Sequence, residues 1–393
     1  MSLHARVLIS LLLFIACTQA GEPKTVRLLT IGNSFSANAT RNLADLAKAG
    51  GHRLVHTSLV ISGASLEVHA KKAQANVASP QAKAGLYSNG LGLKDNLLAE
   101  KWDYVTLQQA SIKSHDIATY QPYAGWLADY IAKHAPQAKL LVHQTWPYRV
   151  DDPRFTKPSD KPGEPKTQEE MYRGLTAAYN QIASDLGARI IPVGDAFYLA
   201  DTDPQWGFRP IKDFNTNKAQ YPALPEQAHS LHMGLYWRKS PDGKTHKLIM
   251  DGHHANPAGE YLGGCVWYEV LFGESVVGNR FLPKGLDADF ARFLQETAHQ
   301  AVHARAPGKR DAAAVIRSMA GQVAFWDFQG EAGQARVGRV LALRYNSNDS
   351  RVYVKGQLGA FENCNPFSYR ESLFDGGSEE AAFTVGAVHR DGT

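Results

Sequence analysis

Short apolar runs alternate with stretches of helical period along the first 270 residues of the chain. The runs typical of buried strands are 26–31, 54–61, 102–107, 139–145 and 189–193. Apolar residues three or four positions apart predict helices at 39–49, 123–134, 169–186 and 257–272. Strands that alternate with helices favour an α/β fold, in which helices cover both faces of a parallel sheet.

Three further segments lie outside this alternation of strands and helices. Residues 149–166 are rich in Pro, Asp and Lys, which predicts a long surface loop. Residues 208–250 show no clear period, except that 236–250 resembles a hairpin around Pro241-Asp242-Gly243. Residues 287–305 have a helical pattern and are expected to close the domain.

The composition changes near residue 306, and a different kind of unit is expected from there to residue 393. The stretches 321–333, 339–345 and 350–362 have the pattern of short strands separated by turns. We expect a small β-rich segment. The sequence AFWDFQGEAG within it resembles the opening of laminin-G and concanavalin-like lectin domains. Since those domains are usually longer, we expect an incomplete, truncated lectin-like domain.

The N-terminus has the features of a secretory signal peptide over residues 1–20. A short basic region precedes the apolar run 7–16, and Thr18-Gln19-Ala20 supplies small residues for cleavage. The run is far shorter than the roughly 20 residues that cross a bilayer, and no later segment of the sequence is long and apolar enough. We expect a secreted or periplasmic protein. In an alternative, the sequence ending at Cys17 is a lipobox and Cys17 carries a lipid anchor.

Charge and cysteine content exclude some classes of protein. The net charge is +4, and loss of residues 1–20 removes one arginine and no acid. Such a mild, interspersed charge does not favour nucleic-acid binding. The two cysteines outside the leader, Cys265 and Cys364, are too few for a disulfide framework, and we expect buried free thiols.

Polar residues or glycines follow four of the predicted strands. Ser34 follows the first predicted strand, Gly63 the second, Gln108 the third and Trp146 the fourth. Ligands of parallel α/β sheets bind beyond the carboxyl ends of the strands. The serine in Gly32-Asn33-Ser34 has two interpretations: a helix N-cap, or a nucleophile whose hydroxyl faces the mouth of the sheet.

A base for such a nucleophile is available in the second half of the chain. Asp251 and His254 are three residues apart just before a predicted helix, and a turn there would bring both side chains to one point. The imidazole would accept the serine proton, and the carboxylate would fix its tautomer. His253 is the competing candidate for the base.

Together these segments resemble the SGNH (GDSL-type) hydrolases, within them a bacterial branch with a GNSFS-type first block. The resemblance covers about residues 25–275. It implies a flavodoxin-like three-layer α/β/α sandwich over 21–305, Ser34 as nucleophile, Gly63 in the oxyanion hole with the Ser34 N–H, and Asp251 with His254 completing the triad. The continuation HANPAGEYLGG is its most specific part.

The chain departs from the family pattern in two blocks. Asn33 replaces the usual Asp of the first block, and the third block, DYVTLQQASIKS, has no Asn to donate to the oxyanion. Gln108, or else Gln109, is the expected substitute. For substrate contacts we expect Asn33, Gln109, Trp146, Tyr148 and His253, since flat aromatic rings suit a sugar ring or an acyl group. Core packing is the alternative for the two aromatics.

The sequence therefore predicts a secreted serine esterase, without a cofactor, that removes an acyl group from a carbohydrate in a small-molecule or polysaccharide ester. Two alternatives stay open. One is a metal-dependent hydrolase with ligands among His229, His232 and His253, together with Asp251 and His254. The other is a non-catalytic carbohydrate-binding protein that has kept the esterase fold, which the missing Asn of the third block motivates.

Overall fold

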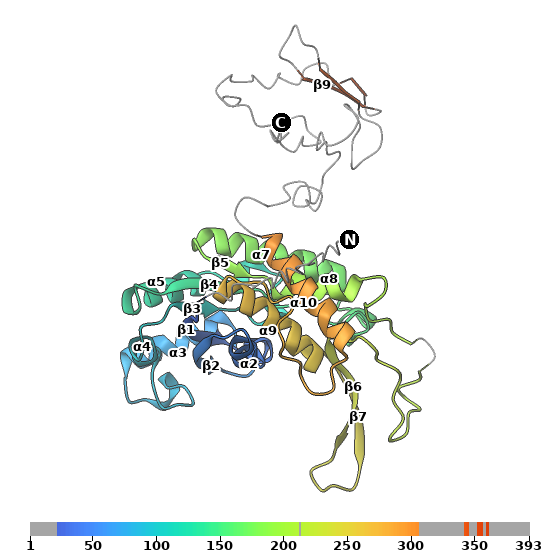
Figure 1. The fold of residues 1–393 in the computed structure, drawn as a ribbon, viewed down its shortest axis with the longest axis horizontal. Coiled ribbons are helices and arrows are strands. Elements are labelled where there is room, and N and C mark those ends of the chain that lie inside the picture. The colour runs from blue at the N-terminus through green and yellow to red at the C-terminus, as the bar shows by residue number, and fades with distance from the viewer. Residues whose placement is uncertain (1–21, 212–213, 306–341, 346–351, 357–358, 361–393) are drawn as a thin grey trace, which may run out of the picture. The chain divides into compact units, whose positions relative to one another are not determined.

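The computed structural model describes residues 22–211 and 214–305, and three short strands at 342–345, 352–356 and 359–360 (Figure 1). The chain divides into two compact units at Gln300, and each unit is described by itself.

A five-stranded parallel sheet forms the centre of the first unit. Its strands are β1 (Thr25–Gly32), β2 (Arg53–Val60), β3 (Tyr104–Leu107), β4 (Lys139–His143) and β5 (Arg189–Ile191), in the order β2-β1-β3-β4-β5. This is the flavodoxin-like order. The α/β prediction is confirmed, and each of the five strands lies within two residues of its expected position.

The helices of this unit are α1 (Ser34–Thr40), α2 (Leu43–Ala49), α3 (Leu66–Ala78), α4 (Leu93–Leu98), α5 (Tyr123–His134), α6 (Pro153–Thr156), α7 (Gln168–Asp185), α8 (Val193–Thr202), α9 (Pro257–Phe272) and α10 (Ala288–His303). The bounds of α5 and α9 are as predicted. The helix expected over 39–49 is two helices, α1 and α2. The segment expected as a loop, 149–166, contains the short α6.

The helices lie on both faces of the sheet, as adjacent residues of β4 show. Val142 faces Ala124 of α5 and Ile182 of α7, because all three line one small pocket. The ring of His143 instead lies 5.1 Å from that of Trp267 in α9. Successive side chains of a strand point to opposite faces, so α5 and α7 cover one face and α9 covers the other.

Helix α9 is buried on all sides and packs closely against α1. Its residues from Ala258 to Phe272 are all buried, which is typical of a helix inside a core. A side chain at Gly263 would place its Cβ 2.8 Å from the Cα of Ala39 in α1, so only glycine permits this approach. The packing fixes α9, and the strand before it, relative to the start of α1.

A two-stranded antiparallel hairpin precedes α9. Its strands are β6 (His232–Lys239) and β7 (His246–Ala255), joined by a turn that contains Pro241-Asp242-Gly243. The predicted hairpin is confirmed and is longer than 236–250. Figure 1 shows it extending away from the helices, with β7 leading back toward α9.

The second unit contains a small antiparallel sheet of order β10-β9-β8, from β8 (Ala342–Tyr345), β9 (Val352–Gly356) and β10 (Gly359–Ala360). The strand expected at 321–333, the leader 1–20 with Cys17, and Cys364 lie outside the described residues. Cys265, in α9, is a buried free thiol.

Within the part of the chain that the structure describes, no helix combines the length and the apolar character needed to cross a membrane.

Candidate active site

The turn between β1 and α1 presents the side chain of Ser34. Asn33 is extended (φ −131°, ψ −158°), and its side-chain oxygen accepts a hydrogen bond from the N–H of Phe35 at 3.0 Å. Asn33 is therefore the N-cap of α1, and the hydroxyl of Ser34 is not used for capping. Ser34 itself is partly exposed. The N-cap interpretation of Ser34 is thus wrong, because its neighbour fills that role.

Asp251 and His254 lie in the last residues of β7, where the sequence suggested a turn. Directly after them, Asn256 caps α9 by accepting hydrogen bonds from the N–H groups of Ala258 (2.9 Å) and Gly259 (3.1 Å). Pro257 occupies the first position of the helix, where its missing N–H costs nothing. The end of the strand and the start of the helix together fix the backbone that carries Asp251 and His254.

Ser34, His254 and Asp251 form a continuous hydrogen-bonded row. The Nε2 of His254 lies 2.9 Å from the Oγ of Ser34, and its Nδ1 lies 2.9 Å from the Oδ2 of Asp251. A carboxylate only accepts, so Nδ1 carries the ring proton and Nε2 presents its lone pair to the hydroxyl. This is the arrangement in which an imidazole can take a proton from serine.

The Asp251 carboxylate is well supplied with donors. Its Oδ1 accepts from the backbone N–H groups of His253 (3.3 Å) and His254 (3.0 Å), and the Nδ1 of His253 lies 3.2 Å away. Partial burial alone would raise the pKa of Asp251. The hydrogen bonds from the ring and backbone of His254 and the nearby His253 outweigh burial, and the pKa falls well below its ordinary value. Asp251 is therefore ionised whenever the imidazole needs an anionic partner.

The row is open to solvent at the histidine end. The side chain of His254 is 34% exposed and that of Asp251 is 17% exposed. His253 lies beside it, with its ring 4.3 Å from the ring of His254 and 5.3 Å from that of Tyr148. Burial lowers the pKa of His253, which favours the neutral form of its imidazole.

Two backbone N–H groups beside Ser34 are available as oxyanion donors. Those of Ser34 and Gly63 have no hydrogen-bond partner within residues 22–211 and 214–305. Gly63 has φ +64°, a conformation that favours glycine. The turn that contains it is held against the end of β1, because Ile61 N–H donates to the carbonyl of Gly32 at 3.1 Å and Asn33 Nδ2 donates to that of Ala64 at 2.9 Å.

Gln108 and Gln109 do not present their amides to this opening. Both are almost fully buried. Gln108 donates to Asn33 Oδ1 (2.7 Å) and to its neighbour's carbonyl (3.1 Å), and its own oxygen accepts from Ser36 N–H at 3.1 Å. Gln109 donates to the carbonyl and hydroxyl of Thr119 and accepts from Leu66 N–H at 3.2 Å. With both amide N–H groups engaged, neither glutamine is placed as the expected third oxyanion donor or substrate contact.

Asn33 is also a structural residue and not a substrate contact. It is 2% exposed, and its side-chain oxygen and nitrogen are used by Phe35, Gln108 and Ala64. The side-chain amide of Asn33 therefore joins the three segments expected to carry the first, second and third blocks. The replacement of the usual Asp by Asn has a physical reason here, because only the amide can both accept from Phe35 N–H and donate to the carbonyl of Ala64.

Trp146 lies in the core, contrary to the expectation of a substrate platform. Its ring is 0% exposed and stacks between Phe35 (4.3 Å) and Phe197 (4.5 Å). Its indole N–H donates to the carbonyl of His253 at 2.9 Å. Through this hydrogen bond, Trp146 supports the backbone of the segment that carries Asp251 and His254. Tyr148 is largely buried as well, with its hydroxyl 3.0 Å from that of Ser111.

The expected metal cluster of His229, His232 and His253 is not formed. His232 is buried and its Nε2 donates to the carbonyl of Pro147 at 3.0 Å. His229 packs against the rings of Trp206 and Phe290, both at 4.9 Å. Asp251, His253 and His254 do place three potential ligand atoms within 4.8 Å of one another, but this group coincides with the row that reaches Ser34.

Sequence reasoning missed several residues that support the nucleophile turn. The Nε2 of His69, in α3, donates to the carbonyl of Gly32 at 3.0 Å, and burial lowers the pKa of this histidine to about 4. The hydroxyl of Ser36 lies against Gln108 and is 3.3 Å from the Nδ1 of buried His143. The polar residues His69 and His143 stand at buried positions of a helix and a strand, and this break in the apolar pattern was the available signal.

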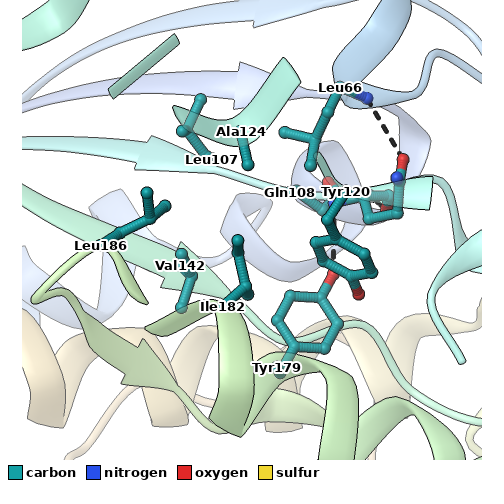
Figure 2. Close-up of a pocket in the computed structure, with 10 residues that line it drawn as sticks. Leu66, Leu107, Gln108, Tyr120, Ala124, Val142, Tyr179, Ile182 and Leu186 are labelled. Atoms are coloured by element: carbon teal, nitrogen blue, oxygen red, sulfur yellow. Dashed lines mark hydrogen bonds between the residues drawn. The ribbon is translucent and has the colours of Figure 1, made fainter. Parts of the chain in front are cut away.

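A small pocket lies between the sheet and helices α5 and α7 (Figure 2). It is lined mainly by apolar residues such as Leu66, Val142 and Ile182, with the rings of Tyr120 and Tyr179 meeting edge to face. Ser34, Asp251 and His254 are not among its lining residues. This pocket is therefore part of the core and not the substrate site.

Comparison with known proteins gives one family. Residues 27–204 match the family described as Domain of unknown function (DUF4886). The match includes Ser34, Gly63 and both glutamines, and it ends before Asp251 and His254. A search of the curated proteins gives no match.

The solved structures that this chain matches include a member of that family. The crystal structure of a DUF4886 family protein from Bacteroides uniformis is 27% identical, with a TM-score of 0.54, and the alignment covers 71% of this chain and 95% of that one. That structure shares the fold of this chain. A candidate SGNH hydrolase from Slackia heliotrinireducens (23% identity, TM-score 0.37, 62% and 98% covered) and phospholipase A1 from Streptomyces albidoflavus (14%, 0.33, 63% and 98%) are more remote.

Proposed function

We propose that the protein is a serine esterase of the SGNH type, secreted or periplasmic, that removes an acyl group from a carbohydrate. The observation that carries this proposal is the position of His254. Its Nε2 lies 2.9 Å from the Oγ of Ser34, and its Nδ1 lies 2.9 Å from the Oδ2 of Asp251. Because Asn33 caps α1, no structural role accounts for the hydroxyl of Ser34. The alternative of a non-catalytic binding protein gives no reason for this alignment.

In the proposed mechanism, Ser34 Oγ attacks the ester carbonyl while its proton passes to His254 Nε2. Asp251 holds the ring in the required tautomer and stabilises the imidazolium. The N–H groups of Ser34 and Gly63 stabilise the oxyanion. His254 then gives the proton to the leaving alcohol, which leaves an acyl-enzyme. Water attacks this intermediate with His254 as base, and the acid is released.

Carbohydrate is proposed as the alcohol part of the ester for two reasons. The leader-like residues 1–20 favour a place outside the cytoplasm, where polysaccharides are available substrates. The β-rich segment after residue 306 carries a stretch that resembles the opening of lectin domains, and it would hold a polymeric substrate. Trp146 no longer supports this choice, because its ring is buried.

The test is turnover of p-nitrophenyl acetate by the protein and by its Ser34→Ala and His254→Ala variants, with Ser79→Ala as the matched control. Ser79 is exposed at the end of α3. We expect losses of about 10³-fold or more in the first two variants, none in the control, and fluorophosphonate labelling of Ser34. Turnover that persists in Ser34→Ala, is lost in His254→Ala and stops on chelation would transfer the reaction to a metal at Asp251, His253 and His254. A folded protein with neither turnover nor label would contradict the esterase.

A further inference from the structure

The hairpin β6–β7 runs directly into the candidate site. Strand β7 runs from His246 at the distal end to Ala255, and its pairing with β6 is regular as far as Asp251 and shifts register between Asp251 and Ala255. The strands pair in register from Lys239 opposite His246 to Leu235 opposite Met250. Side chains of paired residues lie on the same face of a hairpin, and successive residues alternate between faces. Each face can therefore be assigned from the register.

One face of the hairpin is covered by the segment before it. The indole N–H of Trp237 donates to the carbonyl of Ala223 at 2.9 Å, and the ring of Tyr221 stacks on that of His246 at 3.8 Å. Trp237 and His246 belong to the face that also carries Lys239 and Leu248. This face is occupied by the chain itself.

The other face, which we call the arm face, consists of Tyr236, Arg238, Lys247 and Ile249. Tyr236 pairs with Ile249, and Arg238 pairs with Lys247. By the same alternation, Asp251 stands on this side two residues beyond Ile249. Tyr236 and Ile249 are half-buried, and both cations are exposed. The arm face thus leads from two cations, past an aromatic and an aliphatic side chain, to the candidate triad.

The pairing of Arg238 with Lys247 is unfavourable in the protein alone. Like charges directly opposite each other destabilise a strand pair. No carboxylate of the described residues lies within ion-pair distance of either cation, whereas other exposed cations such as Lys71 and Arg173 have one. The carboxylate nearest in sequence, Asp242, is in the turn and accepts from Ser240 and Lys244. An anion bound between the two cations would relieve the repulsion.

We propose that the arm face binds an anionic polysaccharide, with a carboxylate or similar group of the polymer between Arg238 and Lys247 and a sugar ring against Tyr236. This inference rests on the proposed function and names its substrate class: an acylated polyanionic glycan. Lys247 is four residues from Asp251, or about 13 Å along the strand. The anion is therefore on a different sugar unit of the polymer from the one that carries the ester.

The chemistry of the hairpin end favours a glycan over a lipid surface. The turn residues Ser240, Pro241, Asp242 and Gly243 include no large apolar side chain that would insert into a bilayer. Exposed Lys239 and Lys244 flank the turn, whereas Arg238 and Lys247 stand opposite each other on one face, next to Tyr236.

The experiment compares the protein with an Arg238→Gln/Lys247→Gln double variant on three esters: acetylated polygalacturonate, acetylated xylan and p-nitrophenyl acetate. The matched control is Lys239→Gln/Lys244→Gln, which removes the same charge from the same hairpin but not from the arm face. We expect the first variant to lose about tenfold in kcat/KM on the acetylated polygalacturonate alone, and the control to lose less than threefold on every ester.

Affinity electrophoresis in gels with unacetylated polygalacturonate measures the arm face independently of turnover. Retardation should be lost in the Arg238→Gln/Lys247→Gln variant, kept in the control and kept in Ser34→Ala. If the protein hydrolyses no ester, the proposed function fails, and this gel still decides about the arm face. Equal losses in both double variants, an unchanged variant, or binding to phosphatidylglycerol vesicles without retardation in the gel would each overturn the inference.

Discussion

The Nε2 of His254 lies 2.9 Å from the hydroxyl of Ser34, although 220 residues separate the two in the chain. Ser34 opens α1, and His254 stands three residues before α9. The distance between them is therefore set by how closely these two helices pack. They pack closely at Gly263, where an added Cβ would lie 2.8 Å from the Cα of Ala39.

Replacing Gly263 by alanine should separate the two helices and weaken catalysis. The new Cβ would lie 2.8 Å from the backbone of Ala39, which can move only with the whole of α1. We expect a loss of about 1–3 kcal/mol in the free energy of unfolding and a fall of about tenfold in kcat, measured by urea denaturation and ester turnover.

Gly264→Ala is the control for this prediction. Its Cβ would meet the end of the Leu46 side chain at 2.9 Å, and a flexible side chain can move aside. It should cost less stability and leave kcat within about twofold. Equal effects of the two variants on kcat would show that the distance between the helices does not control the reaction.

Asp251→Asn should leave the fold intact and remove most of the activity. An amide can present an N–H to the Nδ1 of His254 and so favour the wrong tautomer, with the ring proton facing Ser34. We expect kcat to fall by about 10³–10⁴-fold with KM within about threefold. Asp242→Asn, in the hairpin turn, is the control and should keep full activity. If the kcat of the Asp251→Asn protein stays within tenfold of that of the parent, an orienting role for Asp251 is excluded.

Trp146→Phe separates the two interpretations of this residue. Phenylalanine keeps a ring between Phe35 and Phe197 but cannot donate to the carbonyl of His253. A supporting role predicts a lower kcat, by about five- to tenfold, with an unchanged KM, and a loss of about 1–2 kcal/mol of stability. A raised KM with an unchanged kcat, from the same steady-state measurements, would instead restore Trp146 as a substrate contact.

The fold could be predicted from the sequence largely because its strands are continuous apolar runs and its longer helices have strong periods. Helix α3 was missed because its buried face consists of Leu66, His69, Ala70, Ala73 and Asn76, and alanine, histidine and asparagine give little hydrophobic signal. Helix α8 was missed because only Pro192 separates β5 from Val193, so the apolar residues of the strand run on into those of the helix.

The candidate triad could be predicted because its members are in short local patterns, a strand-to-helix serine and Asp-x-x-His. The roles of Asn33, Gln108 and Trp146 could not, because they depend on burial by segments far away in sequence. Gln108, for example, donates its two amide N–H groups to Asn33 and to the backbone. A polar residue after a strand looks the same in the sequence whether it faces solvent or the core.

A last prediction concerns a buried carboxyl beneath the site. Asp201, in α8, is fully buried, and burial raises its pKa to about 7, although a hydrogen bond from Gln168 opposes the shift. One of its oxygens has no hydrogen-bond partner among the described residues, and neither has the Nδ1 of His232. The Nδ1 of His232 lies 3.9 Å from the Oδ2 of Asp201, the oxygen that accepts from Gln168. Since His232 donates through Nε2, its Nδ1 presents a lone pair, and the neutral, protonated form of Asp201 suits this neighbour better than the ionised form.

The sign of the pH effect follows from the raised pKa. Between about pH 4 and pH 7 the folded protein holds a proton on Asp201 that the unfolded chain has released, so stability falls as the pH rises through this range and stays low above it. Asp201→Asn is neutral at every pH and lacks this loss. Its melting temperature relative to the parent should rise between pH 5 and pH 8, by the equivalent of a few kcal/mol at roughly 1.4 kcal/mol per pKa unit.

The control for Asp201 is Asp129→Asn, an exposed carboxylate on α5. It should shift the melting temperature equally at both pH values. Curves of melting temperature against pH that run parallel for the parent and the Asp201→Asn protein would mean that Asp201 is ionised in the fold throughout. In that case the charges of Arg149 and Arg209, which lower the pKa of Asp201, would have to outweigh its burial, and a protonated Asp201 would be ruled out.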